Sequence, residues 1–190
     1  MKSVHPLLAV GLMAVATPAL AHTGGHHLWG FSGGFAHPFG GSDHVLAMVS
    51  VGLFAALLGG RAIWSVPASF IAMMLVGGGL GMTGTVLPAF EVGIAASIIV
   101  LGVLVAWRKP LAPVAAAALV GLFAVFHGYA HGIEIPVGST GLAYSIGFAL
   151  ASLSLHILGV LAGASLERHG QAARLSGVAV TLAGLWIAFA

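Results

Sequence analysis

Residues 89–107 have the sequence AFEVGIAASIIVLGVLVAW, in which Glu91 is the one charged side chain. A helix needs about 20 mainly apolar residues to cross the hydrocarbon core of a bilayer, and this segment is close to that length. Arg108, Lys109 and Pro110 follow directly, and these residues predict the end of the helix. The segment therefore has the length and composition of a membrane-spanning helix.

The same pattern recurs along the whole chain. Charges and prolines divide it into apolar segments close to the length that a spanning helix needs: 37–60, 63–83, 89–107, 111–132, 139–163 and 172–189. We therefore predict an all-α integral membrane protein with a bundle of six transmembrane helices, which form one domain over residues 37–190.

The composition excludes most other classes of protein. The chain has 190 residues, of which 6 are Lys or Arg and 4 are Asp or Glu, so that 5% are charged, against roughly 25% in a soluble domain. So few basic residues make no footprint for nucleic acid. The absence of cysteine excludes disulfides, thiolate metal sites and cysteine nucleophiles. Ten histidines against four carboxylates is the feature that needs an explanation.

Residues 1–21 are typical of a cleavable signal peptide. Lys2 provides the positive charge, an apolar stretch follows, and Ala19-Leu20-Ala21 is an A-x-A cleavage site. The alternative is an uncleaved first helix. We expect residues 22–36 to form an extracytoplasmic tail rich in histidine and glycine, in which His22, His26 and His27 either capture metal or are simply solvated.

The basic residues predict the orientation in the plasma membrane. If the mature N-terminus lies outside, the first, third and fifth loops between the predicted helices lie inside. These loops and the adjoining helix ends carry all the basic residues of the mature chain, as the positive-inside rule expects: Arg61, Arg108, Lys109, Arg168 and Arg174.

Ionisable side chains inside a bilayer are costly and usually mark a functional site. The first group of them is His37-Pro38-Phe39-Gly40-Gly41-Ser42-Asp43-His44. His37 and His44 are seven residues apart and share a face if a helix begins at Pro38. Asp43 either ligates a metal directly or holds the imidazole of His44 in one tautomer.

The second group is Phe126-His127-Gly128-Tyr129-Ala130-His131-Gly132-Ile133-Glu134. His127, His131 and Glu134 have the i, i+4, i+7 spacing of one helical stripe. In the predicted topology both groups lie near the outer face, where two histidines and a carboxylate from each helix meet around one ion. Imidazole and carboxylate together suit Ni, Co, Zn, Cu(II) or Fe(II). The alternative is a set of buried histidines joined by hydrogen bonds between helices.

Two further polar residues have open roles. Glu91 begins its helix and either stabilises the helix dipole or lines a pathway. His156 lies alone in the fifth segment, near Ser152 and Ser154. We expect it to form an interhelical hydrogen bond, with a second stop on a transport path as the alternative.

The two groups match the patterns HPxxGxDH and FHGxAHGxE, and the chain resembles the HupE/UreJ family of bacterial nickel/cobalt permeases. The resemblance implies uptake of Ni²⁺ or Co²⁺ across the inner membrane, without enzymatic activity or a tightly bound cofactor. It does not choose between the two metals. The motif residues that it implicates in metal binding are His37, Asp43, His44, His127, His131 and Glu134.

Other functions remain open at this point. An intramembrane metal-dependent hydrolase could use the same residues, with Asp43 or Glu134 as general base, and a bis-histidine haem protein is a more distant alternative. The chain has no G-x-x-x-x-G-K-[ST] motif and hence no ATPase of its own. The expected partners are a divalent transition-metal ion and the lipid bilayer, and a second copy of the chain is an open alternative.

Overall fold

The computed structural model describes residues 30–135 and 141–189, and within these ranges it is helical with no strand. The predicted all-α class is confirmed. The elements are α2 (Gly30–Ala36), the 3₁₀ helix η1 (His37–Phe39), α3 (Ser42–Leu58), α4 (Ala62–Met82), α5 (Phe90–Trp107), α6 (Pro113–Glu134), α7 (Gly141–Glu167) and α8 (Gly170–Phe189).

Five of these helices, α4 to α8, are long and apolar enough to cross a membrane. The segment Gly30–Phe39 and α3 together make a sixth candidate, but the two parts are bent by 81°. The predicted number of spans is therefore reached only if this bent pair counts as one.

The prediction of one continuous first helix over 37–60 is wrong. The helical conformation is interrupted at Gly40 and Gly41, and Gly41 has extended backbone angles (φ −116°, ψ 126°). Glycine favours such a break because it loses more conformational freedom than any other residue when it enters a helix. His37 and His44 therefore lie on two different helical segments and not on one helix face.

The N-terminal segment also differs from the expectation. Residues 30–36, expected as the end of a tail, form helix α2, which packs against α7. The predicted signal peptide at 1–21 and the histidines at 22, 26 and 27 lie outside the described residues.

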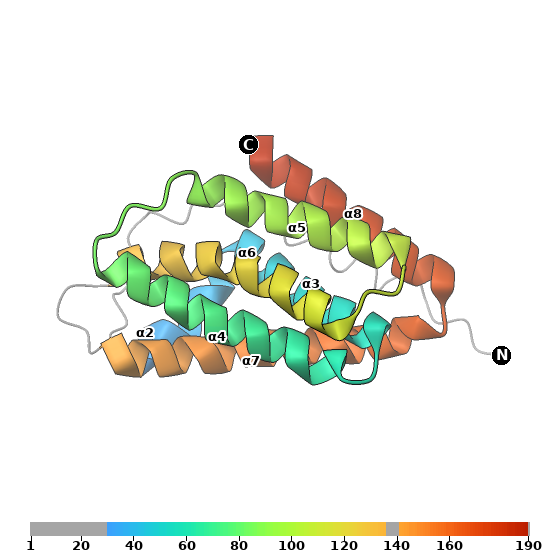
Figure 1. Cartoon of the computed structure of the whole chain (residues 1–190), viewed down its shortest axis with the longest axis horizontal. Helices are drawn as coiled ribbons and strands as arrows, with labels where there is room; N and C mark the ends of the chain where they lie inside the picture. Colours follow the sequence, from blue (N-terminus) through green and yellow to red (C-terminus); the bar gives the residue numbers. More distant parts are fainter. Residues whose placement is uncertain (1–29, 136–140, 190) are drawn as a thin grey trace.

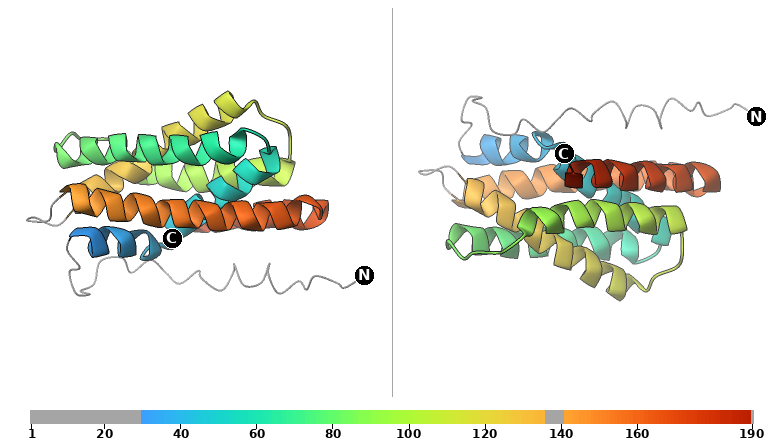
Figure 2. Two further views of the ribbon diagram at one scale, coloured as in Figure 1. Left: turned by 90° about the horizontal axis from the view of Figure 1, so that it is seen from below. Right: turned by 90° about the horizontal axis from the view of Figure 1, so that it is seen from above.

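Helix α3 lies inside the bundle, and the helices pack in pairs that include both parallel and antiparallel neighbours (Figure 1): α4 with α6 and α3 with α7 run parallel, and α5 with α8 runs antiparallel. Helix α4 lies against α6, and α3 against α7, while the pair α5 and α8 stands on one side. Figure 2 shows α2 beside α7 from below and α8 beside α5 from above. Buried apolar side chains of α3 to α7 form the main core.

Glycine allows the closest of these contacts. A Cβ atom added at Gly128 of α6 would collide with the carbonyl group of Met74 in α4, and one at Gly159 of α7 would collide with that of Val49 in α3. Small residues let helix backbones approach in lipid, where the hydrophobic effect does not drive helices together. These contacts set the distances between α4 and α6 and between α3 and α7.

The two ends of the bundle differ in charge. The connections α3–α4, α5–α6 and α7–α8 lie at one end and carry or adjoin Arg61, Arg108, Lys109, Arg168 and Arg174. We call this the basic end. At the opposite end, on the left in Figure 1, α6 ends at Glu134 and α7 begins at Gly141. We call it the Glu134 end.

The packing role of Gly128 makes a first prediction. Gly128→Ala should destabilise the protein, because the new methyl group meets the backbone of α4 and overpacking costs about 1–3 kcal/mol. Gly79→Ala is the matched control, since a Cβ at Gly79 meets nothing within 4 Å. Thermal unfolding in detergent should show a lower midpoint for Gly128→Ala alone. Equal midpoints for the two variants would contradict the packing described here.

Candidate metal centre

The break at Gly40–Gly41 brings His37 to the end of α6. His37 ends up on η1, where its Nε2 atom lies 3.0 Å from Oε2 of Glu134. The imidazole of His37 also stands edge-on to that of His131, with ring centroids 4.8 Å apart. The structure thus joins residues of the two sequence motifs directly, at the Glu134 end of the bundle.

The stripe predicted on α6 is present and descends into the core. Glu134 is exposed, whereas the side chains of His131 and His127 are buried, with 4% and 0% of their surface exposed. Helix α6 extends to Glu134, two residues beyond the predicted end, so that all three residues lie on it. The stripe therefore runs from the exposed Glu134 to the fully buried His127.

His44 fills the space beside this stripe. It lies in the first turn of α3, and its ring centroid is 4.3 Å from that of His131 and 5.1 Å from that of His127. Four imidazoles from η1, α3 and α6 thus form a continuous row of ring contacts, in which His131 contacts His37 and His44, and His44 contacts His127. Within the described part of the chain, one set of ligand atoms lies close enough together to hold an ion, within 4.8 Å of one another: those of His37, His131 and Glu134.

Asp43 contacts the ring of its neighbour. Its Oδ1 atom lies 2.9 Å from Nδ1 of His44. A carboxylate accepts hydrogen bonds, so Nδ1 of His44 carries the proton and Nε2 presents its lone pair. This is the arrangement by which a carboxylate orients a metal-binding histidine from behind, and the geometry favours it over direct ligation by Asp43.

Ser97 of α5 has the same effect on His127. Its hydroxyl donates to the carbonyl of Ile94 at 2.6 Å and lies 2.8 Å from Nε2 of His127. Because the single hydroxyl proton is used at Ile94, the oxygen accepts from Nε2 of His127. The proton of His127 is thereby placed on Nε2, and its Nδ1 atom presents a lone pair.

The remaining ring nitrogens point to an absent ligand. In the described residues, Nε2 of His44, Nδ1 of His127 and both ring nitrogens of His131 are buried without a hydrogen-bond partner. Leaving a buried polar atom unpaired costs about 1–3 kcal/mol. The orphaned atoms of His44 and His127 are the ones whose lone pairs are exposed by the contacts with Asp43 and Ser97. This pattern suits a metal ion, which accepts electron pairs and gives no hydrogen bonds.

A cavity of about 220 Å³ leads to His131 between α4, α6 and α7. Its wall includes Met74, Met82, Tyr144 and Phe148. The Phe148 ring lies 4.0 Å from that of His131, and Tyr144 contacts His37 at 5.9 Å between ring centroids. The cavity therefore reaches His131 and has a partly apolar wall.

Sequence reasoning missed Ser97, Tyr144 and Phe148. Each is embedded in an apolar helical segment, and its only signal is that of a single hydroxyl or ring among aliphatic side chains. The sequence of such a segment does not predict which neighbouring helix the hydroxyl or ring will contact.

The two isolated residues have different outcomes. Glu91 is exposed in the first turn of α5, the position of its helix-dipole alternative. The prediction of a hydrogen bond for His156 is wrong. Its side chain is buried in α7, and in the described structure neither ring nitrogen has a hydrogen-bond partner.

The comparisons with known proteins agree with the two motifs. The model of the HupE / UreJ protein family matches residues 10–187. The chain belongs to the HupE/UreJ family. It is 46% identical over 176 residues to protein HupE of Rhizobium leguminosarum bv. viciae, which covers 91% of this chain and 92% of that relative. No solved structure matches it. The resemblance on the motifs of 37–44 and 126–134 is confirmed at the level of the family.

The hydrogen-bond pattern of this HupE/UreJ chain makes a second prediction. At neutral pH, ring ¹⁵N chemical shifts of the metal-free protein should show the proton of His127 on Nε2 and that of His44 on Nδ1. Ser97→Ala removes the acceptor and should shift His127 alone towards a mixture of tautomers. Ser154→Ala is the control, because Ser154 is exposed on α7 and bonds within its own helix. A His127 proton on Nδ1 in the wild type would contradict the assignment.

Proposed function

We propose that the protein is a permease that takes up Ni²⁺ or Co²⁺ across the bacterial plasma membrane. One observation carries the proposal: imidazoles from two motifs contact one another in an apolar helical bundle, and ligand atoms of His37, His131 and Glu134 lie within 4.8 Å of one another. The family, whose resemblance implies nickel and cobalt uptake, supports the same conclusion.

The proposed ion-binding residues divide by role. His37, His44, His127, His131 and Glu134 provide nitrogen and oxygen ligands, and Asp43 orients His44 from behind. Imidazole nitrogen with a carboxylate suits Ni²⁺ and Co²⁺. The two carboxylates, Asp43 and Glu134, also offset the charge of a divalent ion as it loses water, since an unpaired ion in an apolar medium is very costly.

We further propose that the Glu134 end faces the outside. The basic end then faces the cytoplasm, as the positive-inside rule requires. Entry of a divalent cation gains about 4.6 kcal/mol at 100 mV, inside negative, because each elementary charge contributes about 2.3 kcal/mol. The membrane potential alone can therefore drive accumulation by a chain that has no ATPase motif.

Uptake measurements test this function. Cells that express the protein should accumulate ⁶³Ni or ⁵⁷Co at trace concentration above the vector control. His44→Ala and His131→Ala should lose this uptake, because each removes one of the four imidazoles that contact one another at the proposed site. His169→Ala should keep it, since His169 is exposed beside the basic end. All variants should first be shown to insert in equal amounts.

Two outcomes would overturn the proposal in different ways. If the inserted wild type accumulates neither metal, the permease is refuted. If the wild type transports and His131→Ala does so at full rate, the ion-binding residues are wrong although the function stands.

The role of Asp43 makes a separate prediction. Asp43→Asn no longer offers a charged acceptor to Nδ1 of His44, and loss of such a partner typically weakens metal affinity by about 10- to 100-fold. Titration of the purified protein with Ni²⁺ and with Co²⁺ should show this loss, while Glu167→Gln at the basic end should bind as the wild type does. Unchanged affinity in Asp43→Asn would remove Asp43 from the site.

A further inference from the structure

His156 is a buried imidazole that nothing in the described structure uses. It lies in the middle of α7 with 1% of its surface exposed, and both ring nitrogens lack a hydrogen-bond partner. An apolar side chain at this position would avoid the cost of two unpaired polar atoms. Intramembrane ionisable residues are rare without a functional reason. The position therefore suits a ligand that the nitrogen atoms bind.

The position of His156 continues the descending row of imidazoles. On α7, Phe148 contacts His131, and His156 follows two turns later, about 12 Å further along the helix axis. On α6, His127 lies one turn, about 6 Å, below His131 in the same direction. His156 is thus the next imidazole towards the basic end.

One aromatic ring joins the two levels. The ring of Phe70 in α4 contacts that of His127 with centroids 5.6 Å apart, and it contacts that of His156 at 5.1 Å. Phe70 is itself fully buried. Phe70 therefore lies between the level of His127 and that of His156 and contacts both rings.

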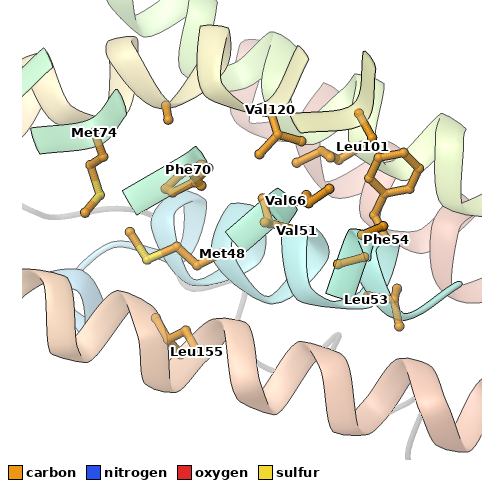
Figure 3. Packing of buried hydrophobic residues seen from close by; sticks show 14 of the residues in the cluster. Met48, Val51, Leu53, Phe54, Val66, Phe70, Met74, Leu101, Val120 and Leu155 are labelled. Carbon is orange, nitrogen blue, oxygen red and sulfur yellow. The ribbon is translucent and has the colours of Figure 1, made fainter. Parts of the chain in front are cut away.

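Other donor atoms lie one turn above His156. Ser152 precedes it by four residues and hence shares its helix face. The buried hydroxyl of Ser152 lies 3.8 Å from the sulfur of Met74 and also donates to the carbonyl of Phe148. Figure 3 shows Met74 and Phe70 of α4 above the stretch of α7 that carries Leu155, the neighbour of His156.

The donors around His156 are neutral. The four carboxylates of the chain all lie in the first or last turn of a helix: Asp43, Glu91, Glu134 and Glu167. An ion at the middle of α7 would therefore be held by imidazole, hydroxyl and thioether groups without a compensating negative charge. Such a set binds a divalent cation more weakly than the carboxylate-bearing group around His131, which favours onward release.

We propose that His156, with Ser152 and Met74, forms a second and transient binding station for a divalent transition-metal ion. It receives the ion from the level of His127 and passes it towards the basic end. This inference rests on the proposed function, because a station needs an ion in transit. It assigns a residue outside both sequence motifs to the inner half of the path.

Separate measurements of binding and transport test the station. In His156→Leu the imidazole is replaced by an apolar side chain that fills the core. The purified variant should bind Ni²⁺ or Co²⁺ at the His131 group with wild-type affinity, while uptake into proteoliposomes with an inside-negative potential should fall at least about tenfold. His169→Leu makes the same replacement outside the path and should retain both properties.

The outcomes distinguish the station from the proposed function. If the wild type transports and folded His156→Leu transports equally fast, the station is refuted and the permease stands. If His156→Leu loses binding as well as transport, His156 belongs to the first site and a separate station is again refuted. If the wild type neither binds nor transports, the proposed function itself fails. If His156→Leu does not fold, His156→Phe is used instead, because it places another aromatic ring beside Phe70. Transport by His156→Phe at the wild-type rate would refute the station.

Discussion

The contact between His37 and Glu134 depends on a break in the first apolar segment. An unbroken helix over 37–60 would keep His37 on the axis of α3. With the 81° bend near Gly40–Gly41, Nε2 of His37 instead lies 3.0 Å from the carboxylate of Glu134 at the end of α6. His44 remains at the start of α3, one level lower and against His131 and His127. The bend thus lets one short motif supply an imidazole at two depths.

Close backbone packing holds the other half of the site. Gly128 lies between His127 and His131 on α6, where it meets the backbone of Met74 in α4. The same turn of α6 therefore carries the imidazoles and forms the tightest contact with its neighbour. Because the two backbones pack directly against each other here, the position of this turn of α6 relative to α4 is closely constrained. A preorganised ligand group loses less entropy when an ion binds.

The distribution of charge along the bundle has a direction. Carboxylates border the imidazoles at the Glu134 end, the middle of α7 offers the neutral donors near His156, and five basic residues gather at the far end. In the proposed function, this distribution would stabilise a divalent cation most strongly where it loses water and less strongly further in. The positive residues at the far end repel a cation, and in the proposed orientation they face the cytoplasm, as the positive-inside rule expects.

The amino-acid sequence by itself determined the class of the fold and singled out the ionisable residues of the two motifs. Apolar segments of the length of a bilayer and the scarcity of charge require spanning helices, since no other open structure satisfies its backbone in lipid. Ionisable groups concentrated in two short motifs are too costly to be incidental. The stripe of His127, His131 and Glu134 followed from helical spacing alone, because it lies within one regular element.

Only the tertiary structure decided how these residues meet. The bend at Gly40–Gly41 could not be predicted, since glycine is common throughout these helices and most of it serves packing. The partner of His127 is Ser97, thirty residues away on another helix, and local spacing contains no information on such a contact. The lack of any partner for His156 reversed the expectation from sequence for the same reason. Whether a buried polar atom is satisfied depends on the neighbouring helix, and helix neighbours are set by packing between segments that are equally apolar.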